Sequence, residues 1–530
     1  MPQTRTTVVR PSDPTLHAAL RLALVFAAIK FVLHIAANLW EAHIGYGYFR
    51  DEFYYLICGR HLAWGYVDHG PIVALQARAA ELLFGKSVTG IRILSAAAGA
   101  ARIFLTGILA WSLGGRRPAQ SLAMLGVLVA PQYLGIDSYL SMNSFESLFW
   151  MTCLLALILI LRTGNHKLWL LFGLSAGLGL LNKPSMTFFL LALLAALLLT
   201  PQRRLLANRW AAAAIALLIL IPLPNLLWQI HHHWPTLEFL RNGQLQNKNV
   251  KLSPIPFLAT QILNLQPATI LIWGAGLIWL LRNPLAKSFR WLGLTYLLFL
   301  AAMMALHAKD YYVSPIYPIL FAVGGIAWER RYARRPAVIA DGVFAFPIFQ
   351  TILLAAFVFI LPMSLPILPP QTWLAYTKAT HLYSATNNTE NQELGPLPQF
   401  YADRFGWQQE VDQVTRIYRS LSPQDQRKTG IYCSNYGEAS AINFLAHDLP
   451  FATSGHNNYF LWGPHGETGE VMILITSATP DEVRPFYTSV QVAGRMENPY
   501  SMPYEHRNIY LARGRKTSFL TSWPDMKFYI

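Results

Sequence analysis

The chain has 530 residues, of which 54% are hydrophobic and only 13% are charged, and its formal net charge is +15. Soluble domains carry about 25% charged residues, so a water-exposed surface of this length would lack the charge that keeps it soluble. The composition excludes a soluble enzyme, a disordered scaffold and a disulfide-stapled secreted module. The three cysteines have no paired spacing and predict neither a zinc site nor a disulfide framework.

The positive charge is concentrated in the first two thirds of the chain. Residues 1–362 contain 29 Lys and Arg against 12 Asp and Glu, a net charge of +17, whereas residues 363–530 contain 13 against 15, a net charge of −2. In the first part the basic residues lie in short loops between apolar runs, which is the pattern of the positive-inside rule. We therefore expect the charge to face a membrane surface, and no nucleic acid is expected as a partner.

Eleven apolar runs are each predicted to form a membrane-spanning helix, since about 20 apolar residues cross the hydrocarbon core of a bilayer. The runs are residues 19–40, 91–113, 119–136, 144–161, 168–181, 185–200, 210–228, 267–282, 291–306, 312–328 and 343–362. The first run is not read as a cleavable signal peptide, because it carries Lys30 and His34 and lacks a small-residue cleavage site.

The basic loops predict the orientation of these spans. Lysines and arginines gather in alternate loops at 116–117, 162–167, 203–209, 282–290 and 330–335. The positive-inside rule places these loops and the N-terminus in the cytoplasm, and eleven spans then place residues 363–530 outside. The predicted organisation is a cytoplasmic N-terminus (residues 1–18), a transmembrane domain (residues 19–362) with a long outer loop at 41–90, and an extracytoplasmic domain (residues 363–530).

The composition of the chain changes at Pro369-Pro370, after which long apolar runs end. Residues 430–435 and 470–476 are predicted to be buried strands, and residues 438–446 a helix between them. This pattern predicts a small α/β domain at the C-terminus. In the outer loop, residues 74–84 are predicted to form an amphipathic helix lying on the membrane surface.

Most acidic residues of the first part fall on the expected outer side. They are Glu41, Asp51, Glu52, Asp68, Glu81, Asp137, Glu146, Glu238 and Asp310. Carboxylates near a membrane are costly and mark candidate functional sites. Asp51 and Glu52 directly follow the first span, where one acid could accept a proton from a nucleophile while the other binds a cation or orients the pair. A solvated turn paired with Arg50 and Arg60 is the alternative.

Two further segments of the outer side carry polar candidates. His69 precedes a Gly-Pro turn and could be a phosphate ligand, a proton shuttle or a turn residue. Asp137 and Asn143 bracket the short loop before the fourth span. Glu146 opens that span, where an acid also suits the helix dipole.

Lysines with aromatic neighbours form another candidate group. Lys183 and Lys309 lie on the expected outer side, and Tyr311 and Tyr312 follow the second of them. Two such lysines could clamp a lipid phosphate, with the tyrosines lining the path of a prenyl chain or a sugar. Interfacial snorkelling of the lysines and an aromatic belt are the alternative. The run His231–His233 has no companion acid at ligand spacing, which disfavours a metal site there.

The order of these motifs resembles a known family. An acidic pair after the first span, a long outer loop ending in a Gly-Pro turn, an acid in the second outer loop, LLNKP at 180–184 and KDYYVSPIYP at 309–318 are similar to glycosyltransferase family 39. This family contains the protein O-mannosyltransferases and the aminoarabinose transferase-like enzymes of the GT-C type. Residues 435–438, 454–459 and 461–464 resemble the C-terminal part of a bacterial subgroup.

The resemblance implies that a sugar moves from a polyprenyl-phosphate donor lipid to an acceptor on the periplasmic face of a bacterial inner membrane. It implies catalytic roles for Asp51 and Glu52, and Asp137, which matches the second-loop acid, is predicted to be the third catalytic residue. The donor-side residues that it implies or leaves as candidates are Arg60, His69, Asn143, Lys183, Lys309, Tyr311 and Tyr312. The family's Lys-Pro turn is replaced here by His69-Gly70-Pro71, so this chain departs from the family at that contact.

Several points stay open at this stage. The acceptor is a protein, lipid A or a cell-envelope glycan, and no residue identifies the sugar. No cofactor is firmly predicted, and a divalent metal ion held by Asp137 and Glu52 is an open alternative. A transporter or lipid flippase is the rival function, although it would need comparable sites on both faces and the chain has no visible internal repeat. A non-catalytic assembly factor is a second rival, and it would not need the three outer acids together.

Overall fold

A computed structural model describes residues 14–332, 342–382 and 390–530 of the chain. The chain forms two compact units. The first unit comprises Met1–Trp40, Arg92–Leu226 and Lys251–Ile367, and the second comprises Glu41–Ile91, Leu227–Val250 and Leu368–Ile530. The second unit therefore combines the C-terminal residues with the loop at 41–90 and part of the segment after the seventh apolar run.

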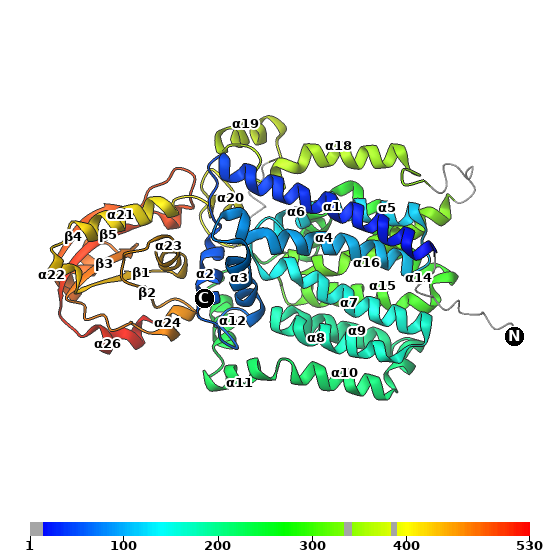
Figure 1. Cartoon of the computed structure of the whole chain (residues 1–530), viewed down its shortest axis with the longest axis horizontal. Helices are drawn as coiled ribbons and strands as arrows, with labels where there is room; N and C mark the ends of the chain where they lie inside the picture. Colours follow the sequence, from blue (N-terminus) through cyan, green and yellow to red (C-terminus); the bar gives the residue numbers. More distant parts are fainter. Residues whose placement is uncertain (1–13, 333–341, 383–389) are drawn as a thin grey trace. The chain divides into compact units, whose positions relative to one another are not determined.

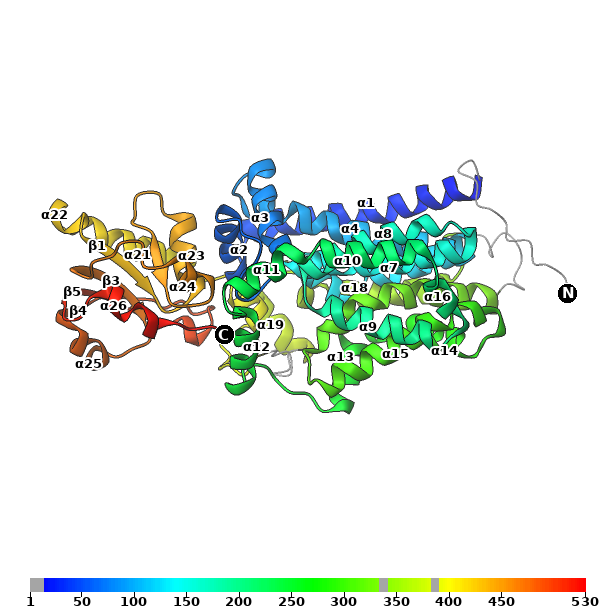
Figure 2. The ribbon, with the colours of Figure 1, turned by 90° about the horizontal axis from the view of Figure 1, so that it is seen from below.

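The first unit is a bundle of helices, whose long members run alongside one another in Figure 2. Its helices are α1 (Pro14–His43), α4 (Val88–Ser112), α5 (Arg117–Leu128), α6 (Pro131–Ile136), α7 (Met142–Thr163), α8 (Trp169–Asn182), α9 (Ser185–Leu198), α10 (Arg209–Leu220), α13 (Pro254–Asn264), α14 (Ile270–Arg282), α15 (Arg290–Ala305), α16 (Tyr317–Arg331) and α18 (Pro347–Ser364). Helix α11 (Leu223–His231) begins in the first unit and ends in the second. All eleven predicted runs coincide with helices. Over the described residues, seven helical segments are long and apolar enough to cross a membrane, or eight if the bent pair α13–α14 is one span.

Two of the predicted single runs are interrupted helices. The run at 119–136 divides into α5 and α6 before Pro131, and the run at 210–228 divides into α10 and α11 next to Pro222. Proline cannot donate a backbone hydrogen bond and its ring clashes with the preceding turn, which explains both interruptions. The polytopic helical class is confirmed, and the number of eleven spans stays a prediction.

Small residues allow the central helices of the bundle to approach closely. Helix α16 packs against both α14 and α5. A Cβ atom built on Gly324 would lie 2.1 Å from the carbonyl oxygen of Ile272, and one on Gly325 would lie 2.2 Å from that of Ala119. A larger side chain at either glycine would push two helices apart, which is why small residues favour helix contacts in membranes.

The C-terminal part of the second unit is an α/β domain, visible in Figure 1. Its five strands are β1 (Thr429–Cys433), β2 (Ala452–Ser454), β3 (Val471–Thr476), β4 (Tyr487–Arg495) and β5 (Asn508–Arg515), in the order β2-β1-β3-β5-β4. Strands β2, β1 and β3 are parallel, and β5 and β4 continue antiparallel. Helices α21 (Trp407–Arg419) and α23 (Tyr436–Leu445) lie on one side of the sheet and α26 (Phe519–Ser522) on the other. The two predicted strands, the helix between them and the α/β class are confirmed.

The loop at 41–90 is largely helical. It contains α2 (Arg50–Arg60) and α3 (Pro71–Phe84), and α2 packs against α3 and against α23 of the α/β domain. The predicted helix at 74–84 is the main part of α3. The second unit also contains α12 (Pro235–Leu245), α19 (Pro370–Thr380), α20 (Gln399–Ala402) and α24 (Asn458–Trp462).

Candidate active site

Asp51 lies in the first turn of α2, where its carboxylate is held from two directions. The Tyr436 hydroxyl donates a hydrogen bond of 2.8 Å to its Oδ1, and the Arg50 Nε lies 3.5 Å from the same oxygen. The Asp51 side chain is 29% exposed. It is therefore a fixed carboxylate with a face open to another molecule, as a general base requires.

Glu52, the second acid of the predicted pair, has a different environment. Its side chain is fully buried, and its Oε2 accepts a 2.8 Å hydrogen bond from the Phe49 backbone N–H at the start of α2. This contact satisfies a backbone donor at the helix N-terminus, where a negative charge also suits the helix dipole. The segment is the first turn of a helix with one acid buried and not a solvated turn, although Asp51 does pair with Arg50 as that alternative expected.

Asp68 and His69 precede α3 and share an aromatic pocket with Tyr54 of α2. The Tyr54 hydroxyl donates a 2.8 Å hydrogen bond to Asp68 Oδ1, and the ring of Tyr54 lies 4.6 Å from that of Tyr436. Burial raises the pKa of Asp68 and lowers that of His69, which favours a neutral imidazole. The sequence marks Asp68 only as one of nine acids on the expected outer side. Its contact with Tyr54, 14 residues earlier in the chain, could be seen only in the structure.

The His69 ring is fixed by its neighbours. It stacks on Tyr66 at 4.5 Å between ring centroids, and its Nδ1 lies 2.8 Å from the backbone oxygen of Gly70. The Nε2 atom is buried and has no hydrogen-bond partner among the described residues. His69 is therefore oriented by the fold, and its role toward a phosphate stays a prediction.

Arg50 links the start of α2 to acids of the C-terminal part. Its guanidinium donates to the Tyr504 hydroxyl and lies 3.9 Å from Asp403 and 3.7 Å from Glu505. Burial raises the pKa of Asp403 to about 7, even though the nearby Arg50 favours its charged form. This buried network fixes the backbone position from which Asp51 extends.

Arg60 ends α2 and is engaged within the second unit. Its guanidinium lies 2.7 Å from Glu81 of α3 and stacks over the ring of Phe444 at 5.0 Å. Its acidic partner is therefore Glu81. A role of Arg60 at a donor phosphate stays a prediction.

The first unit brings together three other predicted donor-side residues and Glu146 around Lys183. Its ammonium donates to Asn143 Oδ1 at 2.9 Å and lies 3.1 Å from Glu146 Oε2. The ring of Tyr312 lies 4.1 Å and that of Tyr311 5.3 Å from the same ammonium. Three segments distant in sequence thus meet at one lysine, which is 7% exposed. We call these five residues the Lys183 cluster.

Glu146 is the member of the Lys183 cluster that the sequence left ambiguous. Besides Lys183, it accepts a hydrogen bond from the Ser185 hydroxyl. Its contacts are with Lys183, in the turn between α8 and α9, and with Ser185 at the start of α9, so the helix dipole is not its main partner. Lys309, by contrast, directly precedes the short helix η5 (Asp310–Ile316) and is partly exposed.

Asp137 is buried inside the first unit between two cations. Its Oδ2 lies 2.7 Å from Arg102 and 3.3 Å from Lys30, and all three side chains are fully buried. A Cβ atom on Gly99 would collide with this carboxylate, so the glycine makes the room for it. Asp137 is therefore the counter-ion of two buried cations, and its catalytic role stays a prediction.

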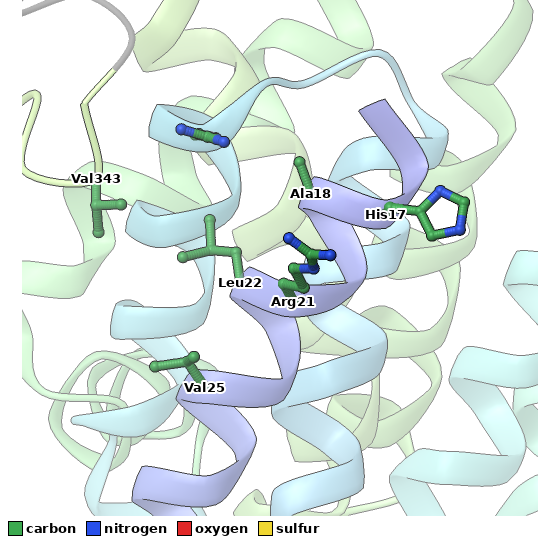
Figure 3. A pocket seen from close by; sticks show the side chains of 7 residues that line it. His17, Ala18, Arg21, Leu22, Val25 and Val343 are labelled. Carbon is green, nitrogen blue, oxygen red and sulfur yellow. The ribbon is translucent and has the colours of Figure 1, made fainter. Parts of the chain in front are cut away.

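Two other features bear on ligands. Within the ranges that the structure describes, no three or more His, Cys, Asp or Glu side chains are grouped so that they could hold a metal ion. A surface hollow, drawn in Figure 3, is lined by His17, Ala18, Arg21, Leu22, Val25, Arg117 and Val343. It contains none of the predicted site residues, and its basic side chains are His17 and Arg21 of α1 and Arg117 of α5.

Comparison with known proteins agrees with this architecture. Residues 68–228 match the family described as dolichyl-phosphate-mannose-protein mannosyltransferase. The crystal structure of ArnT from Cupriavidus metallidurans bound to undecaprenyl phosphate is similar over 92% of this chain and 97% of its own, with a TM-score of 0.58 and 14% identity. The chain has the GT-C glycosyltransferase fold. The apo structure of the same enzyme gives a TM-score of 0.59 and 14% identity over 93% and 98% of the two chains.

The resemblance noted in the motifs is thereby confirmed. The family match covers residues 68–228, and the similarity to the ArnT structures shows the fold of the chain. The matched segment contains His69, Asp137, Asn143 and Lys183, whereas Asp51 precedes it. No curated protein matches the chain.

Proposed function

We propose that the protein transfers a sugar from a polyprenyl-phosphate donor to an acceptor on the outer face of a bacterial inner membrane. The observation that carries the proposal is the fixed, partly exposed carboxylate of Asp51 in a chain with this fold. The similar ArnT structure is bound to undecaprenyl phosphate, and the name of the matched family contains a sugar linked to dolichyl phosphate. Both are polyprenyl phosphates. The acceptor class stays open between a protein, lipid A and a cell-envelope glycan.

In this proposal Asp51 is the general base. Its carboxylate takes the proton from an acceptor hydroxyl or amine while that atom attacks the anomeric carbon. The bond between the anomeric carbon and the phosphate oxygen breaks, the polyprenyl phosphate leaves, and the configuration is inverted. A phosphate monoester is already a good leaving group, so no general acid is required. Glu52 and Asp137 have structural contacts instead, and the base role is assigned to Asp51 alone.

The Lys183 cluster is proposed to bind the donor phosphate. A phosphate oxygen can replace Glu146 on the Lys183 ammonium, and charge-assisted contacts of this kind stabilise the charge that develops on the leaving group. Tyr311 and Tyr312 beside the ammonium offer apolar faces to the lipid or the sugar. Arg60, His69 and Lys309 are further proposed donor contacts. A divalent metal ion is not required by this mechanism.

Replacement of Lys183 tests the donor-binding role. Lys183→Met should raise the donor KM about 30-fold, because a charge-assisted hydrogen bond contributes roughly 2 kcal/mol. The acceptor KM should change by less than about threefold. Steady-state kinetics with a labelled polyprenyl-phosphate sugar, in which donor and acceptor are varied in turn, measure both constants.

The control separates binding from folding. Lys183→Met alone leaves Glu146 as an unpaired buried acid, which destabilises the protein. The double variant Lys183→Met/Glu146→Gln removes both charges, so we expect it to restore accumulation in the membrane but not the donor KM. Equal increases in the two KM values would count against the donor-binding role.

A further inference from the structure

Tyr436 of helix α23, in the C-terminal α/β domain, contacts the proposed base Asp51. Tyr436 is the first residue of α23 and lies 385 positions from Asp51 in the sequence, yet its hydroxyl donates a 2.8 Å hydrogen bond to Asp51 Oδ1. Both residues belong to the second unit.

The local sequence holds Tyr436 in this position. Asn435 caps α23 by accepting from the Glu438 backbone N–H at 3.0 Å, while the Glu438 side chain accepts from the Asn435 N–H at 3.2 Å. This capping box fixes the start of the helix. A Cβ atom on Gly437 would lie 2.6 Å from Arg50 Cγ, so a glycine is needed for α23 to lie this close to α2.

The surroundings keep the tyrosine a hydrogen-bond donor. Tyr436 is 9% exposed, and its ring lies beside that of Tyr54 and under the Arg50 guanidinium, whose Cζ is 5.6 Å from the ring centroid. Burial, together with the negative charge of Asp51, raises the pKa of Tyr436 well above its ordinary value. The phenol therefore keeps its proton, and its oxygen–hydrogen bond is directed at the carboxylate.

We propose that Tyr436 is a positioning residue of the transfer reaction: its hydroxyl holds one oxygen of Asp51, so that the other oxygen is presented to the acceptor. The proposal rests on the proposed function of Asp51 as base. It makes the α/β domain a part of the catalytic apparatus, because a hydrogen bond from this domain orients the carboxylate. A base that rotates freely loses the near-attack geometry on which proton transfer depends.

Chemical labelling tests the contact without any turnover. A water-soluble carbodiimide reacts with carboxyl groups that it can reach, and a hydroxyl that holds one oxygen of a carboxylate hinders this reaction. The full-length protein in lipid vesicles is labelled at pH 6, and the modification of Asp51 is quantified by peptide mass spectrometry. We expect Tyr436→Phe to increase the labelling rate of Asp51 about threefold to tenfold, with exposed Asp448 as the internal reference.

Kinetics then test the consequence of the contact. We expect Tyr436→Phe to lower kcat about 10- to 50-fold and to change the donor KM by less than about twofold, because the substitution removes the hydroxyl that donates to the base. Tyr418→Phe is the matched control, since the Tyr418 hydroxyl donates to the Gln426 backbone oxygen elsewhere in the same domain. It should leave both Asp51 labelling and kcat unchanged.

Each outcome has a defined meaning. An unchanged labelling rate in Tyr436→Phe overturns the inference whatever the activity of the protein. Faster labelling with an unchanged kcat also overturns it, because the contact would then have no role in the reaction. If Asp51→Asn retained wild-type turnover, the proposed base itself would be wrong, and that failure is distinguishable from the two results for Tyr436.

Discussion

Asp51→Asn should lower the turnover of the enzyme about 10³-fold, since a general base contributes about 10²- to 10⁴-fold to a rate. The amide has nearly the same shape as the carboxylate but cannot take a proton from the acceptor. Its oxygen can still accept the hydrogen bond from Tyr436, so the fold of the second unit should be retained. The measurement is the initial rate of sugar transfer by purified protein in lipid, together with the donor Kd.

Asp448→Asn provides the matched control for this substitution. Asp448 lies in the same unit, its side chain is 79% exposed, and its partner Arg419 is also exposed. The control should transfer sugar at the wild-type rate. A full rate in Asp51→Asn would remove Asp51 from the mechanism, and a comparable loss in the control would show that the assay reports folding.

Asp137→Ala should destabilise the protein by about 3–5 kcal/mol, the cost of leaving a buried charge without its partner. The substitution leaves the cations of Lys30 and Arg102 together in the interior of the first unit, with no carboxylate between them. We expect the variant to accumulate poorly in membranes and to unfold at a markedly lower temperature in detergent. The measurement is the thermal unfolding of wild type and variant side by side.

Asp481→Ala is the control for this stability prediction. Asp481 also pairs with an arginine, Arg484 at 2.6 Å, but both side chains are largely exposed. Exposed ion pairs contribute about 0–1 kcal/mol, so this variant should unfold close to the wild-type temperature. Normal accumulation and stability of Asp137→Ala, combined with a loss of turnover, would instead restore the catalytic role that the sequence implied for Asp137.

The sequence predicts the helical elements of this fold well, because their signal is local. Each of the eleven apolar runs coincides with helix, and Pro369-Pro370 marks the start of the C-terminal part of the second unit to within two residues. Interruptions are harder to predict. Pro131 and Pro222 each divide a run, although the mean hydropathy of the run does not register the break.

The site is only partly predictable, because its contacts join segments that are far apart in the sequence. Lys183 and Tyr312 were both candidates, yet only the fold places them 4.1 Å apart. The hydrogen bond from Tyr436 to Asp51 depends on the docking of α23 on α2, for which the sequence has no local signal. Glu52 was predictable in principle, since an acid at the third position of a helix commonly caps it.

The ion pairs of Asp137 with the buried cations Lys30 and Arg102 were not predicted from the sequence, for a different reason. Lys30 was noted only because it argues against a signal peptide, and Arg102 lies within the second apolar run. A charged residue inside a span requires a partner, and Asp137 was the available acid near the end of a neighbouring run. Combining the two rules would have favoured an ion pair over a catalytic acid.

Consumption of the donor lipid tests directly whether the protein is a glycosyltransferase that uses Asp51 as its base. Purified protein in lipid vesicles is incubated with a panel of labelled polyprenyl-phosphate sugars and a crude envelope fraction as acceptor, with Asp51→Asn in parallel. We expect the wild-type protein to consume one donor, to release polyprenyl phosphate and to transfer the label to an acceptor. Asp51→Asn should carry out this transfer about 10³-fold more slowly. Consumption of no donor, or equal consumption by both proteins, would contradict this expectation.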